Sequence, residues 1–144
     1  MRKAQISLDL LFAIFLILLT LVNLTYLATS ETAHSEMFST ISEVKTFSIS
    51  LRDHITKVYA VGEGFKKKEV FPFNLESGES IRIHLNSSSN SIIINATIDG
   101  KSYTITQRSD VPLKDSNVTL TNSKREFWIS TEISGGMLYV KVEP

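Results

Sequence analysis

The side chains most able to do chemistry are scattered along this chain rather than gathered in a motif. The three histidines, His34, His54 and His84, have no metal-ligand spacing. The sequence has no cysteine, which excludes disulfides, thiolate catalysis and cysteine-based metal sites. Serine and threonine are abundant, but no Gly-x-Ser-x-Gly elbow or phosphate loop occurs. We therefore predict no catalytic residues, no metal site and no cofactor, and we expect a protein that is not an enzyme.

The balance of charged residues also limits the kinds of molecule that the protein is expected to bind. The 144 residues include 15 Lys+Arg and 15 Asp+Glu, so the formal net charge is zero. A protein that binds nucleic acid usually carries a basic face, and this balance argues against such binding. The one basic run, Lys66-Lys67-Lys68, is expected to be a solvated turn.

The feature that organises the chain is a long apolar stretch near its N-terminus. Residues 10–30 carry no charge, and as a helix they would extend about 31 Å, enough to cross the hydrocarbon core of a bilayer. Arg2 and Lys3 come before this stretch and Glu31 follows it. The positive-inside rule then predicts a single-pass protein with a cytoplasmic N-terminus and an external remainder.

Three fates are open to such a segment. A secretory signal would be cut after a small residue, and Ala28-Thr29-Ser30 offers a poor site. A signal anchor would stay whole. A third possibility is a cut on the cytoplasmic side, between Ala4 and Gln5, which would leave the apolar helix on the mature protein.

The residues before the apolar run form a pattern of two basic residues, a small residue and a short polar patch, namely Arg2, Lys3, Ala4, Gln5, Ser7 and Asp9. This pattern resembles the class III signal peptide of archaeal type IV pilin-like proteins, the superfamily that includes the archaellins. The family usually has Glu where this chain has Asp9, and Leu where it has Ala13. The resemblance implies a leader peptide, residues 1–4, that a prepilin peptidase removes just before Gln5.

Asp9 is a carboxylate at the mouth of a membrane helix, where charge is costly unless paired or wet. It could simply lie solvated at headgroup level. Alternatively, cleavage before Gln5 creates a new α-amino group, and the Asp9 carboxylate of a neighbouring subunit could pair with it. This second role partly follows from the resemblance, which also implies the pilus assembly machinery as a partner.

The N-terminal helix is predicted to cover residues 5–61, with 5–30 as membrane and filament core and 31–61 as an amphipathic continuation. Its apolar stripe is expected to pack on the following domain and consists of Met37, Ile41, Val44, Leu51, Ile55 and Val58, with Ser48 as a polar break. A homotypic coiled coil is the alternative. Phe38, Phe47 and Ile49 lie off the stripe and suggest a second surface, for a neighbouring subunit.

From residue 69 to residue 144 the apolar period becomes two, which indicates six or seven short antiparallel strands. We expect a strand at 70–73, which Pro72 restricts to an edge or a bulge, and further strands at 80–86, 91–98, 125–131 and 137–143. Asp99-Gly100 predicts a two-residue hairpin that pairs Ala96 with Tyr103 and Ile94 with Ile105. The predicted fold class is α+β, a long helix followed by a small antiparallel sheet or sandwich, as in type IV pilins.

Four Asn-x-Ser/Thr sequons occur in the chain. Asn23 lies at membrane depth and is expected to stay unmodified. Asn86, Asn95 and Asn117 fall in the external domain and are candidates for N-glycosylation.

Together these features predict a structural subunit of an archaeal type IV pilus-like filament at the cell surface. The subunit would wait in the membrane before assembly and would then contact copies of itself. The alternative is a membrane-anchored external β domain, either a minor pilin or a ligand-binding module, that forms no filament. A secreted hydrolase is the weakest hypothesis. A role in adhesion, motility or secretion stays open.

Overall fold

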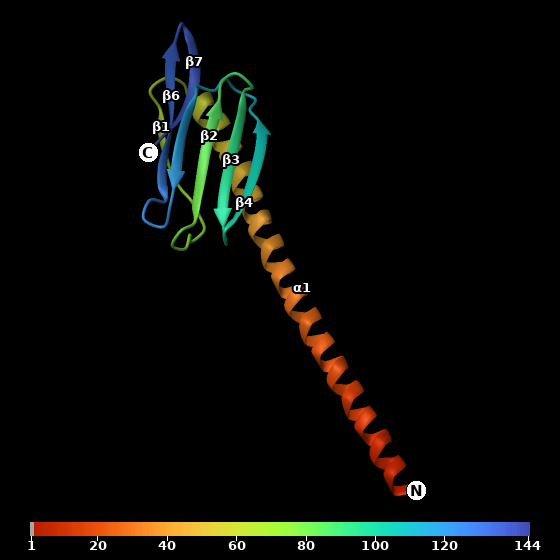
Figure 1. The fold of residues 1–144 in the computed structure, drawn as a ribbon. Helices are drawn as coiled ribbons and strands as arrows, with labels where there is room; N and C mark the ends of the chain where they lie inside the picture. The colour runs from red at the N-terminus through yellow and green to blue at the C-terminus, as the bar shows by residue number, and fades with distance from the viewer. Residues whose placement is uncertain (1) are drawn as a thin grey trace. The chain divides into compact units, whose positions relative to one another are not determined.

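A computed structural model describes residues 2–144, with the backbone alone for residues 2–7, 32–37 and 40. One long helix, α1 (Arg2–Val61), comes first. Seven strands follow it: β1 (Lys66–Val70), β2 (Ser80–Asn86), β3 (Ser91–Ile98), β4 (Lys101–Arg108), β5 (Ser116–Leu120), β6 (Glu126–Ser134) and β7 (Met137–Glu143) (Figure 1). The chain forms two compact units, Met1–Thr40 and Ile41–Pro144. The predicted α+β class is confirmed.

The second unit contains two antiparallel sheets, one of order β1-β6-β7 and one of order β4-β3-β2-β5. They meet where β7 runs beside residues 112–116. The Val140 amide donates to the Pro112 carbonyl (3.0 Å), and the Lys114 amide donates to the Val140 carbonyl (2.8 Å). The Val142 amide donates to the Ser116 hydroxyl (3.0 Å). These bonds satisfy backbone groups along edges that would otherwise be open.

The β3–β4 hairpin follows the predicted register. Ala96 faces Tyr103 and Ile94 faces Ile105. Asp99 and Gly100 both have positive φ, 52° and 69°, as a type I′ turn requires. The turn chemistry and the apolar alternation therefore specify the same pairing.

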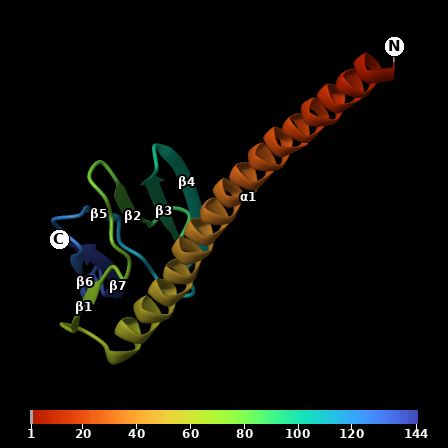
Figure 2. The same cartoon turned by 90° about the horizontal axis from the view of Figure 1, so that it is seen from below.

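The hydrophobic core lies between the later turns of α1 and one face of both sheets (Figure 2). The helix contributes Val44, Phe47, Leu51, Ile55 and Val58, all buried. Alternate residues of β2, β3, β5, β6 and β7 face them, which is why these strands read with a period of two. The predicted packing of the apolar stripe on the β domain is thus confirmed from Val44 onward, although Ile41 is exposed. The Met37 side chain lies outside the described residues.

The prediction that Phe47 belongs to a second contact surface is wrong. Phe47 is only 7% exposed, and its ring lies edge-on to Phe71 with 4.9 Å between centroids. Ser48, the expected polar break, is buried as well. Two sheets face the helix, so the buried arc is wider than a narrow heptad seam. Phe38 and Ile49 are exposed.

The lysine run is not the expected turn, and the expected strand at 70–73 is wrong. Lys66–Val70 is strand β1, paired with β6, so the sheet begins three residues before the predicted domain boundary. Pairing with β6 brings acidic neighbours within reach: Lys68 contacts Glu126 at 2.6 Å, and Lys66 contacts Glu143 at 3.1 Å. β1 lies at the edge of its sheet and ends two residues before Pro72, so the proline does not interrupt it.

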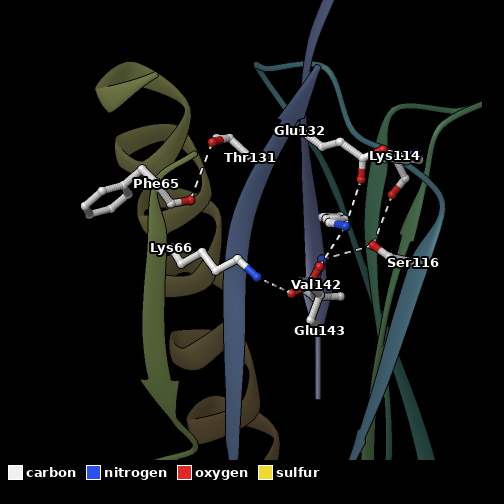
Figure 3. Close-up of polar contacts among 9 residues, drawn as sticks. Phe65, Lys66, Lys114, Ser116, Thr131, Glu132, Val142 and Glu143 are labelled. Atoms are coloured by element: carbon white, nitrogen blue, oxygen red, sulfur yellow. Dashed lines mark hydrogen bonds and ion pairs between the residues drawn. The ribbon is translucent and has the colours of Figure 1, made fainter. Parts of the chain in front are cut away.

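A chain of ion pairs crosses the outer side of the first sheet (Figure 3). Its members, in order of contact, are Lys114, Glu132, Lys141, Glu143 and Lys66. Lys114 belongs to the segment that leads into the second sheet, so the chain of charges also spans the junction between the sheets. Hydrogen bonds from Lys114 and then Lys141 lower the pKa of Glu132 to about 2.

We predict that Leu51→Ala lowers the free energy of unfolding of the second unit by about 2–5 kcal/mol, because it opens a cavity in the core. Ile49→Ala, two residues away and 43% exposed, is the matched control and should cost well under half as much. The single tryptophan, Trp128 on β6, allows chemical unfolding of the detergent-solubilised chain to be followed by fluorescence. Equal losses for the two variants would contradict this core.

The pKa of Glu132 predicts a pH dependence. Its folded pKa of about 2 is below the ordinary 4.5, so the stability it contributes is present above pH 4.5 and is lost as pH falls toward 2. We expect Glu132→Gln to lower the melting temperature at pH 7 and to flatten its decline between pH 5 and pH 2. Glu63→Gln, at an exposed residue, should leave both unchanged. If the melting temperature of Glu132→Gln fell as steeply with pH as that of the wild type, the ion pairs of Glu132 would not be the source of the pH dependence.

Candidate functional site

The first unit carries the feature that the sequence singled out. Among the described residues, Leu8–Glu31 is the one stretch of helix long and apolar enough to cross a membrane, and none of it is buried. Its 24 residues extend about 36 Å. Ala4, Gln5 and Ser7 lie where only the backbone is described, so the predicted cleavage site has no side-chain geometry here. The structure does establish that α1 continues through this region.

Asp9 lies in the second turn of α1 and is exposed. No other described side chain contacts its carboxylate. The acidic group predicted to pair between subunits is therefore accessible at the start of the apolar stretch. An unpaired charge next to an apolar helix is stable in water or at headgroup level, and it needs a counter-charge once it is enclosed.

The exposed side chains of this stretch leave an apolar hollow. It is lined by Leu11, Phe12, Ile14, Phe15 and Leu18, which recur at three- and four-residue spacing along α1. A hollow of this kind between four or five helical side chains is the shape that receives one side chain from a packed neighbouring helix. Lipid chains can fill the same space.

Polar side chains in the apolar stretch bond to their own helix. The hydroxyls of Thr20 and Thr25 donate to the carbonyls of Leu16 (2.6 Å) and Leu21 (2.7 Å). One amide N–H of Asn23 donates to the carbonyl of Leu19 (2.9 Å). Bonds of this type reduce the cost of carrying polar groups into an apolar medium.

Two of the three predicted glycosylation sites share one surface of the second sheet. Asn95 on β3 and Asn117 on β5 are both exposed, and both line a shallow hollow on the side away from the core. β2 lies between them and places Arg82 opposite Asn95 and His84 opposite Asn117. The sequence predicts Asn95 on an outward strand face and Asn117 at the start of a strand. It gives no signal that the two would meet, because their strands are not consecutive in the chain.

The third predicted site, Asn86, ends β2 at the turn before β3. Its amide oxygen accepts the Ser89 amide at 2.9 Å. The next residue, Ser87, donates from both its amide and its hydroxyl to Asp115, and these bonds lower the pKa of the Asp115 carboxyl. Asn86 therefore lies in an ordered turn tied to the loop before β5.

His54 connects α1 to the edge strand. Its Nδ1 contacts the Glu69 carboxylate at 2.9 Å, and Lys67 approaches the same carboxylate at 2.7 Å. Ser50, His54 and Glu69 line one groove beside β1, and the described contacts include no hydrogen bond between the Ser50 hydroxyl and His54. In the described part of the chain no three potential metal ligands of the His, Cys, Asp or Glu type come together. Nothing in the sequence identifies Glu69 as the partner of His54, because the two residues belong to different elements.

Comparison with known proteins adds no relative: the chain matches no family model, no curated protein and no solved structure.

Proposed function

We propose that this protein is a structural subunit of a type IV pilus-like filament at the cell surface. The observation that carries the proposal is the contrast between the two parts of α1. Residues Leu8–Glu31 are apolar and exposed, whereas the later turns of α1 bury one apolar stripe, from Val44 to Val58, against the β domain. One continuous helix thus combines a surface that requires an apolar environment with an anchor for a folded domain.

Before assembly, lipid would cover Leu8–Glu31 and the protein would cross the membrane once, with its N-terminus in the cytoplasm. On assembly, helices of neighbouring subunits would replace the lipid. That exchange gains little hydrophobic free energy, so close packing and polar pairing must direct it. The hollow bounded by Leu11, Phe15 and Leu18 supports such packing.

In this proposal a prepilin peptidase cuts between Ala4 and Gln5, and the pilus assembly machinery extracts the subunit from the membrane. The Asp9 carboxylate then pairs with the new amino group on Gln5 of a neighbouring subunit. Enclosing both charges together avoids the cost of burying either alone. The contact is head-to-tail, so repeated contacts build an open helix rather than a closed ring.

One observation favours the alternative, an anchored β domain that forms no filament. Thr20, Thr25 and Thr29 all donate to carbonyls of their own helix, so they need no second helix to be satisfied in lipid. A minor pilin would lie between these two functions.

Asp9→Asn tests the proposal. Leaving one partner of a buried ion pair unpaired costs about 3–5 kcal/mol, so we expect fewer than a tenth of the wild-type filaments by electron microscopy of the source cells. The amount of protein in the membrane should be unchanged. Asp53→Asn, at an exposed side chain of the same helix, is the control and should assemble normally. Wild-type cells without filaments would favour the anchored domain, and normal filaments from Asp9→Asn would remove the role of Asp9.

We also propose that the external domain is N-glycosylated. Asn95 and Asn117 have exposed side chains, and we expect peptides from the native protein to carry glycans there. Asn95→Gln and Asn117→Gln should each remove one glycan mass, whereas Asn122→Gln, outside any sequon, should remove none. Asn86 is the third candidate. Unmodified peptides at all three sequons would contradict this proposal.

A further inference from the structure

Asn23 differs from the three threonines of the apolar stretch. A threonine has one O–H to donate, and the hydroxyls of Thr20, Thr25 and Thr29 all donate to carbonyls of their own helix. The amide of Asn23 has two N–H donors and one carbonyl oxygen, and only one N–H is used, in the bond to Leu19. Among the described residues nothing contacts the second N–H or the oxygen.

The depth of Asn23 in the membrane makes its unused N–H and amide oxygen costly in free energy. Asn23 precedes Glu31 by eight residues, about 12 Å along the helix, and follows Leu8 by about 22 Å. It would therefore lie within the hydrocarbon layer, where water is absent and an unmet donor and acceptor are unfavourable. An exposed amide at this depth needs a polar partner from outside its own helix.

The surroundings of Asn23 match a helix-pairing face. Leu16 lies seven residues before it, Leu19 four before and Leu27 four after, so all three share its side of α1. All are exposed. A seam of leucines interrupted by one asparagine is the pattern in which a buried amide fixes the register and number of paired helices.

We propose that two copies of this chain pair in parallel in the membrane, before assembly, through the Asn23 amides. The proposal rests on the membrane-inserted stage of the proposed function. Both copies insert in the same direction, so their Asn23 residues lie at the same depth. The free N–H of each amide donates to the oxygen of the other, which satisfies all four groups. This contact is two-fold symmetric and therefore differs from the head-to-tail contact of a filament.

The absence of native cysteine makes disulfide mapping direct. The full chain, reconstituted at low density in phosphatidylcholine vesicles without assembly proteins, would be oxidised after single substitutions. Leu16→Cys and Leu27→Cys, on the Asn23 side, should give strong dimer bands. Ile14→Cys and Leu21→Cys, on the opposite side of the helix, should give at least tenfold less. Equal yields at all four positions would mean random collision and would overturn the proposal.

Asn23→Leu in the Leu16→Cys and Leu27→Cys backgrounds tests the amide itself. We expect at least a tenfold loss of dimer, whereas Thr25→Val, a polar-to-apolar change on the opposite side, should leave the yield unchanged. If no cysteine position gives a dimer, lipid alone covers the helix. If dimers persist in Asn23→Leu, the helices pair through another contact. Either result would overturn the proposal. Because the vesicles contain no assembly machinery, the outcome is independent of whether filaments form in cells.

Discussion

The constraint on which this structure depends is that one helix must suit two environments. From Val44 to Val58 α1 is a core element, and its apolar side chains lose water by packing on two sheets. From Leu8 to Glu31 the same helix is predominantly apolar, and none of this stretch is buried by the residues that the structure describes. In proteins most of the stability of a helix comes from packing of its apolar surface rather than from helix propensity. The β domain stabilises one part, and a membrane or neighbouring helices must enclose the other.

The β domain is built to hold its end of the helix without disulfides. The two sheets are joined by backbone bonds beside β7 and by the ion pairs that run from Lys114 to Lys66, so their inner faces act as one surface for α1. Phe47, Phe71 and Phe127 fill the space where the helix meets the strands. The polar outer face, where Asn95 and Asn117 lie, is then left for solvent or for glycans.

Much of this fold could be predicted from local patterns. The strands at 80–86, 91–98 and 137–143 and the Asp99-Gly100 hairpin follow from alternation and turn chemistry, both of which are encoded within a few residues. The lysines of β1 were missed because their strand character depends on pairing with β6, some sixty residues later. Phe47 was missed because the width of the buried arc depends on how many sheets face the helix.

The same limit applies to the candidate sites. The signal-like pattern around Gln5 and Asp9 is continuous in sequence and could be read directly. The shared surface of Asn95, Arg82 and Asn117 depends on the order of strands in the sheet, which the sequence does not state. The unmet amide of Asn23 became visible only when the bonds of its neighbours were known.

The measurement that tests the central claim most directly is the intact mass and N-terminal sequence of the protein from its native membrane or surface fraction. A mature chain that starts at Gln5 is the predicted result, since it generates the amino group that Asp9 is proposed to meet. An uncut chain would make the protein an anchored β domain and would remove that pairing. A chain that starts at Glu31 would lack the apolar helix altogether and would contradict the filament model.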